Sequence, residues 1–334
     1  MQFNKTVLLL GAGFSKNFGG HLAREMWAKI FNHSLLDSAG DVKWELKKDF
    51  NFETVYSEFY NATTESKKEQ FKILEEVLQD VYKNMNDKLL HPGADTGVNI
   101  NYLQNNFINA FTDDGSGSFG ACFSLNQDLF FEKHFNRNPL GPASVWYGSN
   151  QNTVNEADLR TDKTLPTIEQ IKEYKDQLSG HGFGFIKLHG SLNWKTPGGE
   201  SAKVIGINKP EIIETIPLLK WYRDLFIEAM QQENIKLVVY GYSFGDKYIN
   251  DIILDAIHGT HERSGSKMKI YIISTENQSV LKKRLEDSEH GEIWTAVDGY
   301  FPYQMKEMFP TNEVSTPEYK ELINRIEFGT STVS

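Results

Sequence analysis

The sequence predicts an α/β protein with a Rossmann-like parallel sheet, helices on both faces of that sheet, and an inserted helical subdomain. Short apolar segments recur along the chain, and each runs into a glycine-rich or polar turn, which is typical of doubly wound folds. The first segment, residues 7–10, meets the turn GAGFS at residues 11–15. Residues about 35–112 instead carry apolar side chains at helical spacing and no strand pattern. These observations together predict a sheet interrupted by a helical insertion.

The elements follow in order along the chain. After the first turn, residues 21–31 (HLAREMWAKIF) have the apolar spacing of a helix. Beyond the insertion and a loop at 112–120, we predict strands at 121–125 (ACFSL), 184–188 (GFIKL), 236–240 (KLVVY) and 269–273 (KIYII). Helices are predicted at 217–232, 246–258 and 317–326, and residues 136–182 form a small polar lobe. We expect one catalytic domain over residues 1–290 and a C-terminal extension over 291–334.

Composition restricts the classes of function. The chain has 334 residues, a net charge of −10 and a single cysteine, Cys122. One cysteine excludes an intramolecular disulfide and any zinc site built from four cysteines or from two cysteines and two histidines. The acidic balance argues against strong direct binding to nucleic acid. No apolar run approaches the roughly 20 residues of a membrane span, and the short apolar start is no signal peptide, so we expect a cytoplasmic protein without membrane contact.

The first glycine turn indicates a phosphate site without naming the ligand. Backbone N–H groups of such a turn can approach a phosphate at the start of a helix. The spacing is not the dehydrogenase fingerprint, because Lys16 stands at the third glycine position, and no Walker A motif follows. A tight turn that binds nothing stays an open alternative.

Polar residues follow several predicted strands. The turns GAGFS, LNQD, LHGS and GYSF each come directly after a strand, so in a parallel sheet all four line one crevice. That convergence carries more weight than any single motif. The reactive residue types that it gathers are Asn126, Asp128, His189, Ser191 and Ser243.

The ordered set GAGFS, SLNQD, KLHGS and GYSFGD resembles the sirtuin-like family, and in particular its bacterial branch of antiphage NAD hydrolases. The resemblance covers the nucleotide fold and leaves out the helical insertion and the tail. It implies that NAD is the substrate and that Asn126, His189 and Asp128 are the catalytic residues. It also implies the residues that bind the rest of NAD: Gly11, Ala12, Gly13, Phe14, Ser15, Gly190, Ser191, Gly241, Ser243, Ser274 and Glu276.

These residue types suit cleavage of the bond between nicotinamide and ribose. Positive charge develops at the anomeric carbon as that bond breaks. An amide such as Asn126 can position water and the ribose, and a carboxylate such as Asp128 can stabilise the positive charge. A histidine such as His189 can accept a proton from a hydroxyl or from water near neutral pH.

Each catalytic candidate also has a structural alternative. Asn126 is a residue type that caps helices, Asp128 suits the first turn of a helix, and His189 suits a half-buried structural position. Asp246 is interpreted as the cap of the helix that follows GYSF. Among the histidines, only His258 and His261 stand three residues apart, and we interpret them as a surface pair and predict no metal site.

The resemblance favours a hydrolase over a protein deacylase. Deacylating sirtuins carry a structural zinc held by two cysteine pairs, which this chain cannot form, and the sequence LNWKTPGGE shows no recognisable peptide-binding strand. A deacylase and a module that senses NAD or ADP-ribose without chemistry remain the alternatives. A defence role implies control by assembly, either as a homo-oligomer or with a partner such as a translocase-type ATPase or an Argonaute-type protein. We expect the helical insertion to be the assembly surface.

Overall fold

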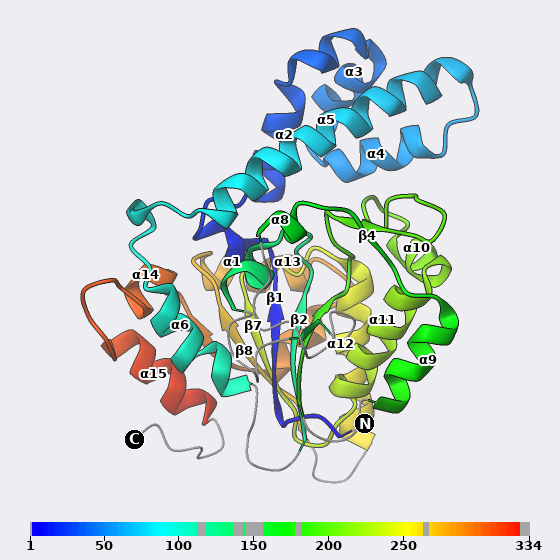
Figure 1. The fold of residues 1–334 in the computed structure, drawn as a ribbon. Helices are drawn as coiled ribbons and strands as arrows, with labels where there is room; N and C mark the ends of the chain where they lie inside the picture. Colours follow the sequence, from blue (N-terminus) through cyan, green and yellow to red (C-terminus); the bar gives the residue numbers. More distant parts are fainter. Residues whose placement is uncertain are drawn as a thin grey trace.

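A parallel β-sheet forms the centre of the molecule in the computed structural model, which describes residues 2–111, 118–135, 143–144, 156–177, 182–262 and 267–327 (Figure 1). Within these residues the strand order is β3-β5-β2-β1-β7-β8-β9, and every neighbouring pair is parallel. From β5 to β9 this is the Rossmann order, with the order reversing at β1 and β7. The predicted fold class is therefore confirmed. The strands span Thr6–Leu10 (β1), Phe119–Ser124 (β2), Ala143–Ser144 (β3), Gly182–Lys187 (β5), Lys236–Tyr240 (β7), Lys269–Ile273 (β8) and Val297–Phe301 (β9).

Both faces of the sheet are covered, and β1 shows why its sequence is apolar throughout. Its five residues are all buried, with Leu8 and Leu10 in one core cluster and Val7 and Leu9 in the other. One face packs against α9 (Ile168–Gln177), α10 (Lys209–Thr215), α11 (Pro217–Met230), α12 (Lys247–Glu262) and α13 (Gln278–Glu286). The other packs against α1 (Ala12–Lys16), α2 (Ala23–Phe31), α6 (Ile100–Asn106), α7 (Phe130–His134), α14 (Met305–Met308) and α15 (Pro317–Ile326).

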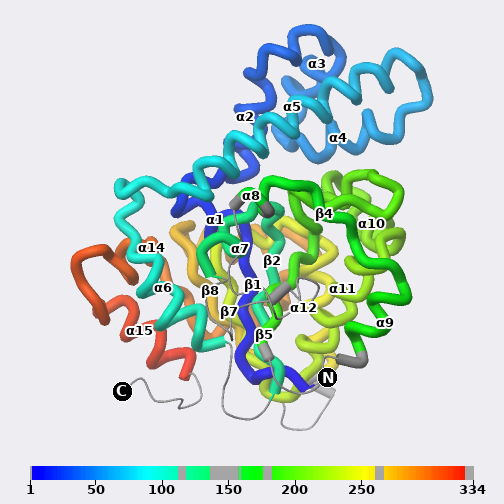
Figure 2. The backbone as a smooth tube through the Cα atoms, viewed as in Figure 1, coloured from blue at the N-terminus to red at the C-terminus, as the bar shows by residue number. Residues whose placement is uncertain are grey.

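The predicted helical insertion is helical in all its regular elements. It comprises η1 (Ser34–Ser38), α3 (Gly40–Lys48), α4 (Phe52–Tyr60), α5 (Glu65–Leu90), η2 (Ala94–Thr96), α6 and η3 (Ile108–Phe111). Helices α3 and α4 project from the sheet, and the 26-residue helix α5 returns the chain to the body (Figure 2). Most of its buried residues, such as Leu78, belong to the same cluster as Leu8 of β1. The insertion is therefore continuous with the core on one face of the sheet.

The region after residue 290 contains a strand that the sequence pattern does not reveal. Strand β9 pairs with β8, so this part of the chain extends the sheet. Four of its five residues are only half-buried, as expected at a sheet edge, and VDGYF therefore has no apolar run. Helix α15 has the predicted bounds.

The polar lobe is described only in part. Its described elements are β3, α8 (Glu156–Leu159), β4 (Lys163–Thr164) and α9, and β4 pairs with β6 (Trp194–Lys195). Residues 136–142, 145–155 and 178–181 lie outside the described part of the chain, as do residues 112–117 of the predicted loop.

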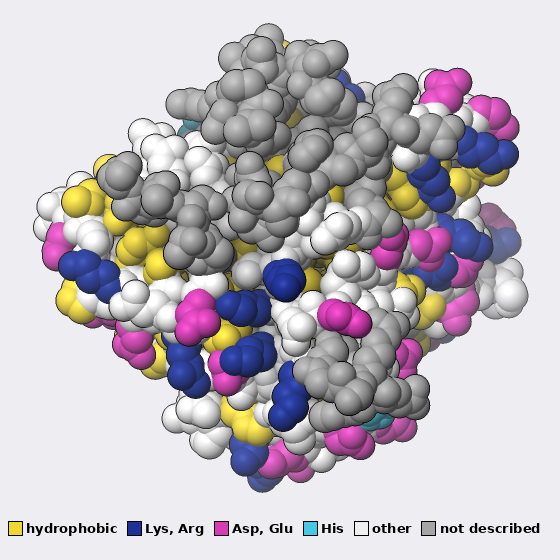
Figure 3. Space-filling view, turned by 90° about the horizontal axis from the view of Figure 1, so that it is seen from below, with side chains coloured by type: hydrophobic (Ala, Val, Ile, Leu, Met, Phe, Trp, Pro, Cys, Tyr) yellow, Lys and Arg dark blue, Asp and Glu magenta, His cyan; other side chains and the backbone are white. Residues whose placement is uncertain are grey.

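The surface opposite the insertion carries both signs of charge. Figure 3 shows Lys and Arg side chains intermixed with Asp and Glu on the described part of that face. None of the helices in the described residues combines the length and the apolar character that a bilayer crossing requires.

Candidate functional site

Two glycine turns meet where the strand order reverses. The backbone N–H of Gly13, after β1, donates a hydrogen bond to the carbonyl of Gly241, after β7, over 2.8 Å. A Cβ atom at Gly13 would lie 2.7 Å from the Gly241 Cα, and Gly241 has a φ of +65°. A Cβ at Gly11 would lie 2.6 Å from both the Gly241 carbonyl oxygen and the Tyr242 Cα. All three glycines therefore have a packing role, which is to let the two turns touch.

The rest of the GAGFS turn divides between the core and a cavity. Ala12 and Ser15 line the cavity. The ring of Phe14 is buried and packs edge-on against Phe130 and Tyr240. Any contact of Phe14 with a ligand would therefore involve its backbone alone.

The cavity has a volume of about 150 Å³ and lies at the carboxyl ends of β1, β2 and β5. It brings together Ser15, Asn126, Asp128 and His189, which come from three separate turns. This is the edge of an open α/β sheet at which ligands bind. The helical insertion closes the cavity from the other side. The full lining is Ala12, Ser15, His21, Ala23, Met26, Phe52, Glu53, Tyr82, Met85, Leu125, Asn126, Gln127, Asp128, His189 and Val204.

Asn126 is fixed against the first turn and does not cap a helix. Its Nδ2 donates hydrogen bonds to the Gly11 carbonyl over 2.9 Å and to Ser15 Oγ over 3.0 Å. The residue at the N-cap of α7 is Leu129. The structural alternative for Asn126 is therefore wrong.

The Asp128 carboxylate makes two hydrogen bonds. One carboxylate oxygen accepts the backbone N–H of Phe130 over 3.0 Å, at the start of α7. The other accepts the Ser15 hydroxyl over 2.6 Å. Asp128 therefore precedes the N-cap Leu129 and does not lie in the first turn of α7, where the acidic residue is Glu132, and its carboxylate holds Ser15 at the cavity wall.

A buried lysine supports this wall from behind. Lys187 Nζ donates to Glu132 Oε1 over 2.7 Å, to Ser191 Oγ over 2.9 Å, and to the Asp128 carbonyl. Burial raises the pKa of Glu132, and the Lys187 charge opposes that shift. The Ser191 hydroxyl therefore binds Lys187. Neither Ser191 nor its neighbour Gly190 lines the cavity. Gly190 has a φ of +71°, which is the left-handed conformation that glycine favours.

His189 is buried and neutral near pH 7. Its pKa is lowered to about 4, first by burial and then by the charge of Lys209, while Asp246 and a hydrogen bond to the Leu125 backbone oppose the shift. Its Nε2 makes no hydrogen bond, although it lies 3.3 Å from Asp246 Oδ2. A neutral imidazole carries one unprotonated nitrogen, which can accept a proton.

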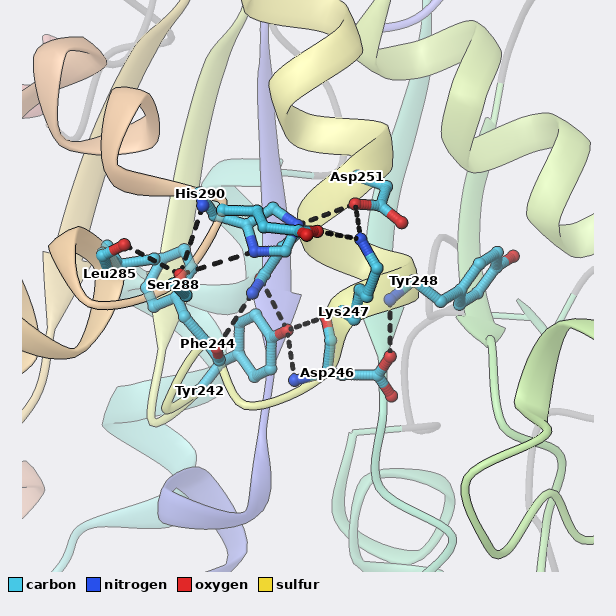
Figure 4. Close-up of polar contacts among 11 residues, drawn as sticks. Tyr242, Phe244, Asp246, Lys247, Tyr248, Asp251, Leu285, Ser288 and His290 are labelled. Carbon is cyan, nitrogen blue, oxygen red and sulfur yellow. Dashed lines mark hydrogen bonds and ion pairs between the residues drawn. The ribbon is translucent and has the colours of Figure 1, made fainter.

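Asp246, interpreted as a helix cap, does cap α12 and also reaches the site. Its Oδ1 accepts the Tyr248 N–H over 3.1 Å, and the Tyr242 hydroxyl donates to its carbonyl over 3.0 Å (Figure 4). Its Oδ2 faces His189 and accepts a hydrogen bond from Lys209 over 2.9 Å. Lys209 also lies 3.0 Å from Glu53 of the insertion. Sequence reasoning missed Lys209 and Glu53, because neither follows a strand of the main sheet.

The residues expected at the adenosine end form a separate, more exposed group. Arg284 donates to the Ser243 carbonyl over 2.9 Å and to Glu276 Oε2 over 3.0 Å. Ser274 Oγ accepts the Glu276 N–H over 3.2 Å, and the Tyr300 hydroxyl donates to the Glu276 carbonyl over 2.6 Å. None of these residues lines the cavity. Arg284 lies in the basic run at residues 282–284, on α13.

Comparison with known protein families identifies the fold family. A model described as a SIR2-like domain matches residues 121–293. The chain belongs to the SIR2-like family. SIR2-like domains are generally NAD-dependent enzymes, and the match includes Asn126, Asp128, His189 and Asp246. The turn GAGFS precedes the matched range, and a comparison with curated proteins found no match.

The SIR2-like site contains no candidate metal centre in the part of the chain that the structure describes. No group of three or more His, Cys, Asp or Glu side chains there could hold a metal ion. Cys122 is buried in β2, and burial raises the pKa of its thiol. The polar side chains of this SIR2-like cavity are two imidazoles, two amides, two carboxylates and two hydroxyls, from His21, His189, Asn126, Gln127, Glu53, Asp128, Ser15 and Tyr82.

Proposed function

We propose that this protein is an NAD glycohydrolase, which cleaves NAD into nicotinamide and ADP-ribose. The observation that carries the proposal is the convergence of Ser15, Asn126, Asp128 and the unpaired Nε2 of His189 on one cavity. A family that uses NAD and a polar cavity at the carboxyl ends of the strands both support NAD as the substrate. The cavity is smaller than the roughly 300–1,000 Å³ of sites that hold a whole drug-sized ligand, so it suits the nicotinamide ribose alone.

The proposed reaction uses Asp128, Asn126 and His189 of the cavity. The bond between the anomeric carbon and nicotinamide breaks, and its electron pair leaves with nicotinamide. The Asp128 carboxylate stabilises the positive charge that develops on the ribose. Asn126 orients the ribose and a water molecule, whose oxygen bonds to the anomeric carbon. Nε2 of His189 accepts the proton of that water and releases it to solvent.

Hydrolysis is favoured over deacylation by what surrounds the cavity. Glu53, Tyr82 and Met85 of the insertion line the side that faces the strand ends. An acyl-lysine substrate would need a peptide groove on that side, whereas water needs none. One cysteine also rules out the zinc module with two cysteine pairs.

The test is to incubate purified protein with NAD and to quantify nicotinamide and ADP-ribose by chromatography. We expect equal amounts of both products, and loss of both in His189→Ala and Asn126→Ala. Full activity in these variants would contradict the assignment. Turnover only with an acyl-lysine peptide would establish a deacylase, and tight binding by calorimetry without nicotinamide release would establish a sensor.

We further propose that the enzyme is an antiphage effector that depletes cellular NAD on infection and is kept silent by assembly. The support is the resemblance of its motifs to that bacterial branch. A homo-oligomer, a translocase-type ATPase or an Argonaute-type protein would provide the control. Measuring NAD in phage-infected cells with wild-type protein and with His189→Ala tests the role, and native mass spectrometry of complexes from those cells tests the assembly. Equal NAD levels in both cultures would refute the defence role.

A further inference from the structure

We propose that Asp246 and Lys209 are positioning residues for His189, and that Glu53 makes the helical insertion part of the same unit. The effects on kinetics that we expect from this inference rest on the proposed function. The effects on the charge and orientation of the His189 imidazole do not. No motif of the sequence joins these four residues, which come from four separate segments of the chain.

The contacts form a continuous chain from the insertion to the imidazole. Glu53 Oε2 lies 3.0 Å from Lys209 Nζ, which lies 2.9 Å from Asp246 Oδ2, and that same oxygen lies 3.3 Å from His189 Nε2. The side chains of Lys209 and Asp246 are only 14% and 10% exposed, so water screens these charges little. The attraction between charges this well buried is stronger than at the surface, and the desolvation of both groups opposes it.

The insertion holds the Lys209 segment at a second point. The hydroxyl of Ser57 accepts the backbone N–H of Ile207 over 2.8 Å. Glu53 and Ser57 are four residues apart on α4 and therefore lie on one face of that helix. The neighbouring Gly206 has a φ of +107° and leaves no room for a Cβ beside the Ser57 hydroxyl. Helix α4 thus holds the segment that carries Lys209 by one ion pair and one hydrogen bond.

The charges on this chain act on His189 in opposite directions. The positive charge of Lys209 lowers the pKa of His189, and the negative charge of Asp246 raises it. The other titratable side chains around the cavity are His21, Glu53, Tyr82 and Asp128. Burial raises the pKa of Glu53, opposed by Lys209, and the carboxylates of Glu53 and Asp246 raise the pKa of Lys209 against its burial. A displacement of α4 would therefore change the field at Nε2.

The direct experiment is a pH titration of the His189 imidazole by nitrogen NMR in the full-length protein, with His189→Ala used to assign the signal among nine histidines. We expect Lys209→Met to raise the His189 pKa by about one unit and Asp246→Asn to lower it. Lys209→Arg should keep the wild-type value. The matched control is Lys247→Met, because Lys247 adjoins Asp246 in sequence but pairs outward with Asp251 and Glu289 (Figure 4). An unchanged titration in Lys209→Met would overturn the inference, and should Asp246→Asn fail to fold, Lys209→Met still decides it.

A double-mutant cycle tests the part played by the insertion. Glu53→Gln and Asp246→Asn are each expected to lower kcat/KM for NAD about tenfold or more, and the double variant should lose no more than the worse single variant. Losses that simply multiply would show that the insertion acts independently of Asp246 and would overturn that part of the proposal. Absence of NAD cleavage in the wild-type protein would instead refute the proposed function, while the NMR titration would still test the positioning of His189.

Discussion

The two ends of the candidate NAD site are built differently. At the cavity, Asp128 and His189 are buried, and the Asp128 carboxylate is held by the Ser15 hydroxyl from another turn. At the other end, Ser243 is exposed and Glu276 is half-buried in an ion pair with Arg284. Buried polar groups interact strongly and in fixed geometry, whereas exposed groups are screened by water. We therefore expect the buried end to carry out catalysis and the exposed end to bind the rest of NAD. Substitutions at the buried end should have large effects on kcat, and those at the exposed end should have small effects on KM.

The largest effect is expected from His189→Ala. Removal of a general base typically lowers a rate about 10²–10⁴-fold, and we expect a loss of kcat in that range. Nicotinamide release under saturating NAD measures it. The control is His258→Ala, because His258 is an exposed histidine that pairs with Glu292. If both variants were equally active, the catalytic step would not depend on His189 at the buried end of the site.

The pH dependence of stability should reveal the buried imidazole. The pKa of His189 is about 4 in the folded protein and 6.5 when exposed, so below pH 6.5 the unfolded chain binds the extra proton. Stability is therefore lost as pH falls from about 6.5 to about 4, by about 3 kcal/mol from this group. Urea unfolding across that range measures the slope, which His189→Gln should flatten. An identical slope in that variant would mean that His189 is not buried in its neutral form.

Ser15→Ala should have an intermediate effect. The variant leaves the Asp128 carboxylate without its 2.6 Å hydrogen bond. Hydrogen bonds to charged groups contribute about 1.5–3 kcal/mol, which corresponds to a loss of kcat of about ten- to a hundredfold. The matched control is Ser38→Ala, at an exposed hydroxyl on the insertion. If Ser15→Ala raises KM alone, Ser15 contributes to binding and not to chemistry.

Gly13→Ala tests the contact that joins the two ends. The added Cβ would meet the Gly241 backbone, so we expect a destabilisation of about 1–3 kcal/mol. Thermal unfolding measures it. Gly259→Ala, in α12 with nothing within 4 Å of its added Cβ, should instead stabilise by about 0.5–1 kcal/mol. A neutral Gly13→Ala would indicate that the two turns can separate freely.

The smallest effect is expected from Glu276→Gln at the exposed end of the candidate NAD site. Its partly exposed ion pair should contribute little, so KM for NAD should change less than about fivefold at constant kcat. Steady-state kinetics separates the two constants. A fall in kcat as large as that of Ser15→Ala would contradict the division between chemistry and recognition.

The sequence predicted the central strands well and the edge strand not at all. Strands β7 and β8 have the predicted bounds, because a strand covered on both faces is a continuous apolar run. Within the described part of the chain, strand β9 pairs with a neighbouring strand along one edge only, and four of its five residues are half-buried. Its sequence VDGYF therefore contains no apolar run and looks like a polar turn. A strand that is buried on both faces can be recognised from its apolar sequence, whereas a half-buried edge strand can hardly be recognised in this way.

The same reasoning explains which site residues were found. Asn126 and His189 follow strands directly, so position along the chain predicts that they meet. Lys209 begins the short helix α10, and Glu53 lies on the insertion, more than 150 residues earlier. Only the folded structure brings these two charges together, since nothing in their local sequence marks them.

The pairing of β1 with β7 sets the order in which the site can be completed during synthesis. Thr6 pairs with Lys236, so the central strand lacks one of its neighbours until most of the chain has left the ribosome. The turn at Gly241, which clamps Gly13, and Asp246, which faces His189, emerge later still. A nascent chain therefore cannot assemble the complete site. For an enzyme that would consume a cofactor of its own cell, this topology delays activity until the segment that contains Asp246 has been synthesised.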